Sequence, residues 1–269
     1  MRHIIFAVVL CCSTGSAVAQ PDALSNEALL SKTRALYDAP FERNLVSFDC
    51  AVQFNWSQHF IDSLGAVPPG AGPTLQQLQG ISHRVFVDDS HVVVSSQPEQ
   101  PDLTGLEHAA DLERIFKGMV PSGLGMWMPF STNVILPTGS TRFSFEKIDP
   151  GYKLSMNGIG VAATLLLTND LRITSFVSQL PQTIRATTEF TQGPNGFLLS
   201  SITTGPTTDP AARGDATFSY TYQTVKGFQL PSLVTMNLSP SEIWRYTLTD
   251  CKVTAGVAIQ VGPPPSSPD

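Results

Sequence analysis

Residues 46–56 have the sequence VSFDCAVQFNW, in which apolar and smaller or polar side chains alternate. One set of alternate positions is apolar throughout: Val46, Phe48, Cys50, Val52, Phe54 and Trp56. A period of two over this length is typical of a β-strand with one buried face, and is far from the period of about 3.6 residues of a helix. The segment therefore predicts a long strand packed against an apolar core.

The second half of the chain repeats this pattern as strands joined by short turns. Turn sequences lie at Asp149-Pro150-Gly151, at Asn169-Asp170 and at residues 193–196, and a hairpin is expected over residues 83–95. We count about ten or eleven strands, enough that an antiparallel sheet must curl or close. The predicted fold class is mainly β (α+β): a large curved antiparallel sheet forming a half-open β-barrel, with two or so helices as a lid.

The two helices are expected at residues 23–38 and 103–118, where apolar side chains recur at helical spacing. Residues 64–80 are expected to form a loop because Pro68, Pro69, Gly70, Gly72 and Pro73 lie close together.

Residues 119–136 are the most unusual part of the chain, because they are very apolar and rich in methionine. They include Met119, Leu124, Met126, Trp127, Met128 and Phe130. Pro121, Gly123, Gly125 and Pro129 interrupt the run and predict an irregular loop in place of a helix. Methionine suits surfaces that adapt to varied apolar partners. Two interpretations stay open, a flexible lip on a hydrophobic cavity and a loop folded into the core.

The N-terminus predicts export. Residues 4–12 are apolar but too few to span a bilayer, and Ala17-Val18-Ala19 matches a signal-peptidase site. We therefore expect a signal peptide over residues 1–19, a single domain over residues 20–255, and a Pro/Ser-rich disordered tail over residues 256–269. The expected location is the periplasm, or else the extracellular space.

The charge balance limits the partners. The chain has 16 basic and 22 acidic residues, a formal net charge of −6. Nucleic-acid binding requires a basic surface, so no nucleic-acid partner is expected. Beyond the N-terminal segment no apolar run is long enough to cross a membrane, so the protein is not expected to be an integral membrane protein. A monomer is the expected state.

Cys50 and Cys251 are the cysteines left after removal of the expected signal peptide. In an oxidising compartment a disulfide between them is the favoured interpretation, and two buried free thiols are the alternative. A metal site is not expected, because two cysteines without paired histidines do not complete a tetrahedral shell.

The sequence contains no recognisable catalytic motif. His59, His83, His91 and His108 do not have metal-site spacing, and no serine lies in a G-x-S-x-G sequence. Asp88-Asp89 is explained by the hairpin turn. We therefore expect a non-enzymatic protein without a cofactor, with a site assembled from distant loops as the open alternative.

Two segments near the end of the chain carry a resemblance to a known superfamily. Residues 226–232 have the sequence KGFQLPS, a turn followed by two strands, and the final strand includes TDCKV at 249–253. Together with the leading helix, the long first strand and the many-stranded sheet, they resemble the LolA/LolB-type carriers of lipids and lipoproteins in the periplasm. The resemblance covers most of residues 23–253.

That resemblance implies an unclosed barrel around an apolar cavity for acyl chains. Val52, Phe54 and Trp56 would line its wall, and the Cys50–Cys251 pair would join the first and last long strands. The remaining cavity candidates are Met119, Leu124, Met126, Trp127, Met128 and Phe130. The expected function is a periplasmic carrier or binder of a lipid, a lipoprotein or another amphiphile. An envelope sensor or scaffold that binds another protein is the alternative, followed by a secreted hydrolase with a dispersed site.

Overall fold

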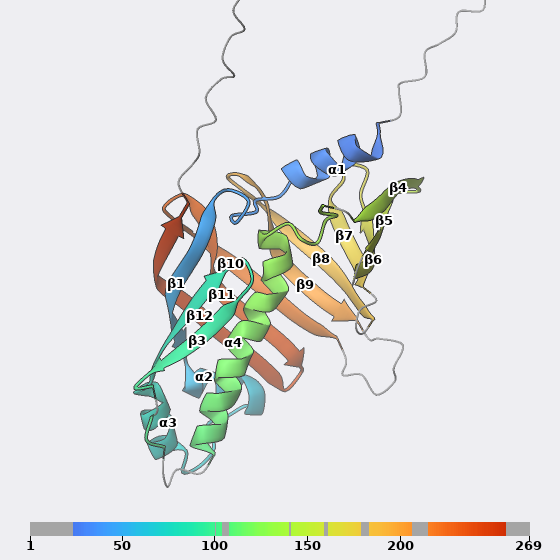
Figure 1. Ribbon diagram of the computed structural model, residues 1–269. Helices are drawn as coiled ribbons and strands as arrows, with labels where there is room; N and C mark the ends of the chain where they lie inside the picture. Colours follow the sequence, from blue (N-terminus) through green and yellow to red (C-terminus); the bar gives the residue numbers. More distant parts are fainter. Residues whose placement is uncertain are drawn as a thin grey trace, which may run out of the picture.

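The computed structural model describes residues 24–99, 101–103, 108–139, 141–158, 161–178, 183–205 and 215–256. The expected signal peptide and residues 257–269 of the expected tail lie outside these ranges. A single sheet of twelve strands dominates the described chain (Figure 1), in the order β3-β2-β1-β12-β11-β10-β9-β8-β7-β6-β5-β4. All neighbouring strands pair antiparallel, and β3 and β4 form the two edges.

The strands of the first half are β1 (Leu45–Phe54), β2 (Ser82–Asp88) and β3 (Val92–Gln97). Those of the second half are β4 (Arg142–Ile148), β5 (Gly151–Gly158), β6 (Val161–Leu167), β7 (Ile173–Ser178), β8 (Ile184–Gly193), β9 (Gly196–Gly205), β10 (Ala216–Val225), β11 (Phe228–Ser239) and β12 (Glu242–Ala255). The predicted hairpins are confirmed, and the number of strands exceeds our count by one or two.

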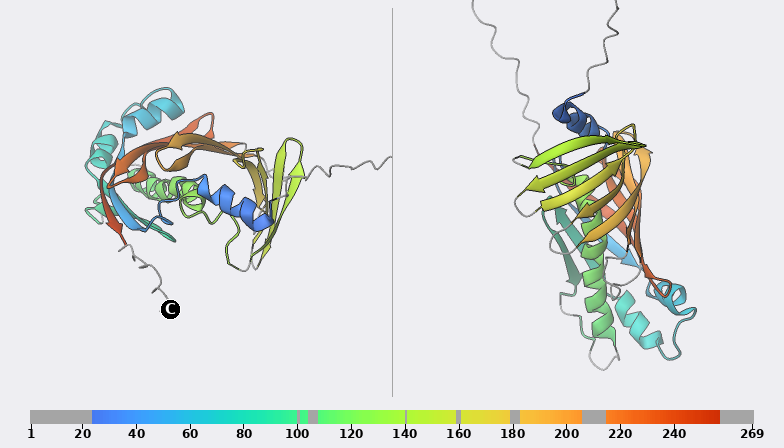
Figure 2. Two further views of the ribbon diagram at one scale, coloured as in Figure 1. Left: turned by 90° about the horizontal axis from the view of Figure 1, so that it is seen from above. Right: turned by 90° about the vertical axis from the view of Figure 1, so that its right-hand side faces the viewer.

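The sheet is strongly curved and does not close. Seen from above it wraps around helix α4 (Ala109–Ser131), while helix α1 (Asn26–Ala35) lies across one end of the opening (Figure 2). The predicted mainly-β, half-open barrel with covering helices is therefore confirmed.

Two further helices, α2 (Trp56–Leu64) and α3 (Gly72–Gln79), make the prediction of a loop over residues 64–80 wrong. Pro73 lies in the first turn of α3, where the missing amide hydrogen costs no helical hydrogen bond. Gly65 ends α2 in the left-handed conformation, with φ of 78°. Gly72 and Pro73 thus begin a helix, whereas Pro68, Pro69 and Gly70 lie in the connection between α2 and α3, where the loop prediction holds.

The long strand predicted over residues 46–56 ends two residues earlier than predicted. β1 ends at Phe54, and the side chain of Asn55 accepts a hydrogen bond from the amide of Gln58 at 3.0 Å, which caps α2. Trp56 is therefore the first residue of a helix and not a strand residue. An N-cap asparagine satisfies an amide that would otherwise lack a partner, so it competes effectively with extension of the strand.

The prediction of an irregular loop after residue 118 is also wrong. α4 runs through Pro121 and Pro129 as a single helix of 23 residues. Its buried side chains include Phe116, Val120, Leu124 and Trp127, at spacings of four, four and three. Packing of this stripe against the sheet outweighs the cost of the two prolines, which local propensity alone did not predict.

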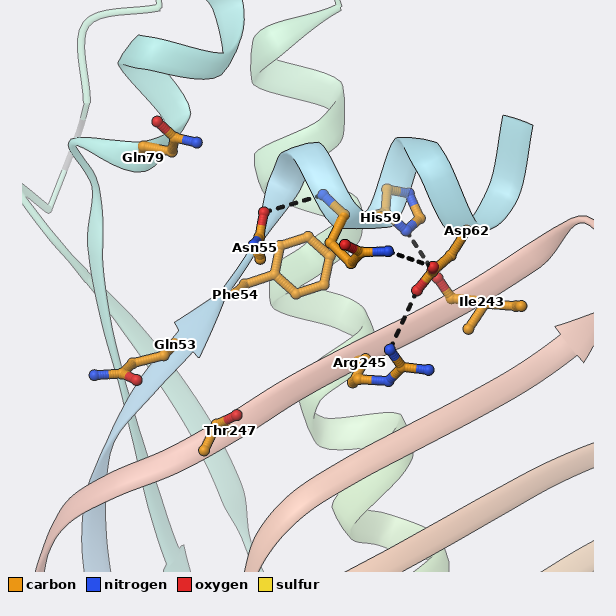
Figure 3. A pocket seen from close by; sticks show the side chains of 10 residues that line it. Gln53, Phe54, Asn55, His59, Asp62, Gln79, Ile243, Arg245 and Thr247 are labelled. Atoms are coloured by element: carbon orange, nitrogen blue, oxygen red, sulfur yellow. Dashed lines mark hydrogen bonds and ion pairs between the residues drawn. The ribbon is translucent and has the colours of Figure 1, made fainter. Parts of the chain in front are cut away.

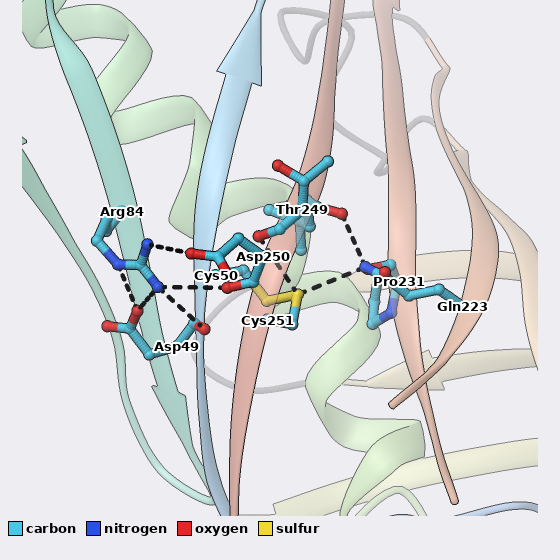
Figure 4. Close-up of a disulfide and its surroundings, with 9 residues drawn as sticks. Asp49, Cys50, Arg84, Gln223, Pro231, Thr249, Asp250 and Cys251 are labelled. Atoms are coloured by element: carbon cyan, nitrogen blue, oxygen red, sulfur yellow. Dashed lines mark hydrogen bonds and ion pairs between the residues drawn. A yellow bond between two sulfur atoms is a disulfide. The ribbon is translucent and has the colours of Figure 1, made fainter. Parts of the chain in front are cut away.

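A disulfide joins Cys50 on β1 to Cys251 on β12, as favoured from the sequence (Figure 4). The two strands are neighbours, and the bond spans a sequence separation of 201 residues. Beside it, Arg84 on β2 forms ion pairs with Asp49 and Asp250. The bond thus fixes the first strand of the chain to the last.

Two apolar clusters form the core. The larger lies between α4 and strands β1, β2 and β9–β12, and the smaller lies between α1 and strands β5–β7. Phe176 and Phe190 pack against both clusters, so they mark where the two halves of the concave face meet.

Candidate functional site

The concave face of the sheet is the candidate site, and α4 occupies the half formed by β1 and β9–β12. Trp127 packs between Phe41 and Phe48, with ring centroids 6.4 and 6.1 Å away. At the other end of the helix, Phe116 lies 4.6 Å from the ring of Phe54 and 5.6 Å from Trp56. Aromatic side chains of the sheet and of α4 therefore interlock along the length of the helix.

Two buried tyrosines fix α4 to the sheet through its backbone. The hydroxyl of Tyr220 donates to the carbonyl of Gly123 at 2.8 Å, and that of Tyr246 donates to the carbonyl of Val120 at 3.0 Å. Burial raises the pKa of both phenols well above its ordinary value, so both stay protonated as donors. Each bond contributes about 1 kcal/mol.

Gly123 allows this close approach. A Cβ atom at this position would lie 2.7 Å from the hydroxyl oxygen of Tyr246 and 3.0 Å from the sulfur of Met236. Real Cβ atoms do not come that close to a neighbour, so a side chain here would push the helix away from the sheet. The glycine that suggested a loop in the sequence is thus a packing position.

A buried polar cluster holds the N-terminal half of α4 against β2 and β3. The hydroxyl of Ser96 donates to Glu113 Oε1 at 2.8 Å, and His83 Nε2 lies 3.6 Å from the same oxygen. Lys117 Nζ also approaches Glu113, at 3.8 Å. Burial lowers the pKa of His83, and the nearby Glu113 carboxylate offsets part of that effect.

A hydrogen bond holds the chain just beyond the C-terminal end of α4, and two ion pairs lie in the segments around it. Glu42 accepts hydrogen bonds from Arg34 at 2.9 Å and from the side chain of Asn133, just beyond the helix, at 2.8 Å. Arg43 forms an ion pair with the buried Asp38, with its Nη2 atom 2.8 Å from Oδ1. Both ends of α4 are therefore attached to the sheet or to the segment that leads into β1.

The residues predicted from sequence to line a cavity lie around this helix. Those that are buried are Val52, Trp56, Leu124, Trp127 and Phe130, and those that are partly buried are Phe54, Met119, Met126 and Met128. Beside Trp127 and Phe130 remains a void of about 10 Å³, roughly the space of one water molecule. This part of the concave face is filled by the protein's own side chains, and ligand contact by these residues stays a prediction.

The other half of the concave face, on β4–β8, is covered less completely. The pairing registers place one row of side chains across its lower end: Phe143, Met156, Ala163, Ser178 and Ile184. Ile184 is 40% exposed, Phe143, Ala163 and Ser178 are half-buried, and Met156 is buried. We call these five residues, together with Phe176 beside them, the open row. Sequence reasoning did not select it, although Phe143 and Phe145 alternate with polar residues.

Two of the three methionines of α4, Met119 and Met126, lie on the flank of the helix toward this open row, whereas Met128 lies on the opposite side. Met119, Met126 and Phe130 share one flank of the helix, within about 40° of one another at 100° per residue. Phe130 contacts Phe176 on β7 and Phe190 on β8, with ring centroids 6.5 and 5.8 Å away. The opposite flank carries Lys117, near β3. Met119 and Met126 therefore extend the partly buried apolar surface from the sheet onto the helix.

α1 and the segment after α4 cover the upper end of the same strands. The amide of Ile173 donates to the hydroxyl oxygen of Tyr37 at 2.7 Å, and the amide of Phe145 donates to Asn26 Oδ1 at 3.2 Å. Burial raises the pKa of Tyr37 to about 12. Leu29 and Leu30 of α1 are buried against this end. The exposed apolar surface of β4–β8 is therefore confined to the open row, at the lower end of these strands.

Comparison with protein-family models, with curated proteins and with solved structures found no match to this chain. The resemblance to LolA/LolB-type carriers therefore stays a prediction. Among the described residues, the helices are all too short or too polar to cross a membrane.

Proposed function

We propose that the protein is an exported carrier or binder of an amphiphile, such as a lipid or the acyl chains of a lipoprotein, acting in the periplasm. The observation that carries this proposal is the open row. It is a mainly apolar row on the concave face of an unclosed sheet, in which Ile184 is 40% exposed and Phe143, Ala163 and Phe176 are partly buried. It continues onto the flank of α4 that carries Met119 and Met126. Export rests on the N-terminal sequence.

The open row supplies what an acyl chain needs. Transfer of a methylene from water to an apolar surface contributes about 0.8 kcal/mol, and the effect is not directional. Methionine side chains adapt to chains of different shape, which suits a carrier of low specificity. Because α4 fills the half of the concave face formed by β1 and β9–β12, bound chains would lie beside the helix unless the helix moves out.

Two aspartate variants on opposite faces of the sheet test this proposal. Ile184 lies on the concave face and is 40% exposed, and Leu166 lies on β6, on the convex face, and is 41% exposed. A charge at position 184 would have to be desolvated beside a bound chain. We expect Ile184→Asp to weaken binding of a fluorescent fatty acid, such as cis-parinaric acid, by about tenfold or more. Leu166→Asp should bind as the unaltered protein does.

Native mass spectrometry of protein purified from the periplasm gives an independent readout. We expect a lipid to co-purify with the unaltered protein and with Leu166→Asp, and to be lost from Ile184→Asp. Absence of fatty-acid binding, or equal binding by both variants, would contradict the proposal. A co-purifying polypeptide in place of lipid would favour the scaffold alternative.

A further inference from the structure

A second pocket lies on the convex side of the sheet, far from the open row in the strand order. It has a volume of about 520 Å³, within the range of small-molecule sites. The end of β1, helices α2 and α3 and strand β12 form its walls (Figure 3). The side chains labelled around it include Gln53, Asn55, His59, Asp62, Gln79 and Arg245.

The charges in this pocket are balanced. Asp62 Oδ2 lies 3.4 Å from Arg245 Nη1, and Asp62 also accepts a hydrogen bond from Gln58 Nε2 at 2.7 Å. His59 Nδ1 lies 2.8 Å from the carbonyl oxygen of Ile243, so this nitrogen carries the proton and Nε2 is the ring's acceptor. Burial lowers the pKa of His59, which keeps the imidazole neutral near pH 7. A strongly charged ligand would therefore find no unpaired opposite charge here.

The amide side chains retain unused hydrogen-bonding capacity. Asn55 uses its oxygen to cap α2 and keeps its amino group, whereas Gln58 uses its amino group and keeps its oxygen. Within the described part of the chain, Gln53 and Gln79 make no side-chain hydrogen bond, and Thr247 adds a hydroxyl directly across from Gln53. The wall thus offers both hydrogen-bond donors and acceptors. It matches ligand groups, such as hydroxyls, that both donate and accept hydrogen bonds.

An aromatic side chain supplies an apolar patch in the same pocket. The ring of Phe54 lines the pocket and also packs against the core, with Trp56 and Phe116 each 4.6 Å away and Trp244 5.6 Å away, so its orientation is fixed by packing. A neighbouring pocket of about 320 Å³, between β1, β2 and α3, shares Gln53, Phe54 and Gln79 with the first. The two pockets adjoin at these three residues, and we call them together the groove.

We propose that this groove binds an uncharged, hydroxyl-rich ligand, a short neutral oligosaccharide. Sugar hydroxyls both donate and accept hydrogen bonds, as the amide wall does, and the C–H face of a sugar ring fits an aromatic surface. This inference stands apart from the amphiphile proposal, because the residues of the groove and those of the open row do not overlap. Either can fail without the other.

Titration calorimetry with maltotriose, cellotriose and N-acetylated chitotriose tests the groove. We expect saturable binding of at least one of them at a single site. Gln53→Ala and Gln79→Ala should each weaken that binding about fivefold or more. Gln77→Ala is the matched control, because Gln77 is an exposed glutamine of the same helix that does not line either pocket. It should change the affinity by less than about twofold.

Three results would overturn the proposal: no binding of any of the three sugars, equal binding by the Gln53 and Gln79 variants and the unaltered protein, or tighter binding of a chitosan trimer, which is cationic, than of its neutral acetylated form. All three substitutions lie on the surface, so far-ultraviolet circular dichroism is expected to show that each variant is folded.

Discussion

The two halves of the concave face differ in how they are closed. The half on β1 and β9–β12 is sealed by α4, through interlocked aromatic rings and two tyrosine hydrogen bonds to the helix backbone. The half on β4–β8 is covered by α1 at its upper end only. The open row, at the lower end of these strands, stays partly exposed. One curved sheet thus has a complete core along one side and unused apolar surface along the other.

This difference places the candidate binding surface. Two carbonyls of α4 accept hydrogen bonds from buried tyrosines, and polar contacts hold both of its ends. The helix is therefore a structural element of the fold. In the open row, Phe176 contacts Phe130 of α4 and Met156 is buried, whereas Ile184 is 40% exposed. An apolar ligand could bury this partly exposed surface without first displacing any part of the protein.

The largest expected effect compares one aromatic residue from each half. Trp127 is 3% exposed and contacts Phe41 and Phe48, so Trp127→Ala should lower the free energy of unfolding by about 3–5 kcal/mol. Phe143 is half-buried in the open row, so Phe143→Ala should cost about 1 kcal/mol, or roughly half of a full side-chain burial. Urea unfolding measures both. Similar losses for the two variants would contradict the distinction between the halves.

A smaller effect is expected from two glycines of α4. Gly123→Ala introduces a Cβ atom against Tyr246 and Met236 and should destabilise the protein by about 1–3 kcal/mol. Gly125→Ala meets no atom within 4 Å, and alanine favours a helix, so this variant should gain up to about 1 kcal/mol.

If thermal and urea unfolding show that Gly123→Ala lowers the stability and Gly125→Ala raises it, close packing of α4 against the sheet is supported. A stabilising Gly123→Ala would show that the helix is not pressed against the sheet in solution.

The smallest effect concerns pH. The folded pKa values of His59 and His83 lie below the ordinary value of 6.5, mainly through burial. The unfolded chain therefore binds more protons below about pH 6.5, and stability should fall as the pH is lowered from 7.5 to 5.5. Glu113 faces His83 and favours its protonation, and Lys117 opposes it, so the change is expected to be modest.

Unfolding midpoints at pH 7.5 and 5.5 for the unaltered protein and for His83→Gln test this expectation. The variant should lose part of the pH dependence, because glutamine does not titrate. An unchanged difference between the two midpoints would show that the buried cluster at the N-terminal half of α4 does not contribute to the pH dependence of stability.

The strands and their turns could be predicted from the sequence because each depends on neighbours along the chain. Period-two alternation marks β1, and turn residues such as Asn169-Asp170 mark hairpins, so the antiparallel order and the tendency to curl were predictable. The disulfide was predictable because Cys50 and Cys251 are the pair left in the expected mature chain.

The path of α4 and the site were decided only by tertiary structure. Pro121, Gly123 and Pro129 disfavour a helix locally, and the hydrogen bonds that hold the helix to the sheet come from Tyr220 and Tyr246, more than 80 residues later in the chain. The open row likewise depends on the register of five separate strands. Local sequence determines which residues can form a strand or a turn, but which apolar surface is buried depends on contacts that exist only once distant segments meet.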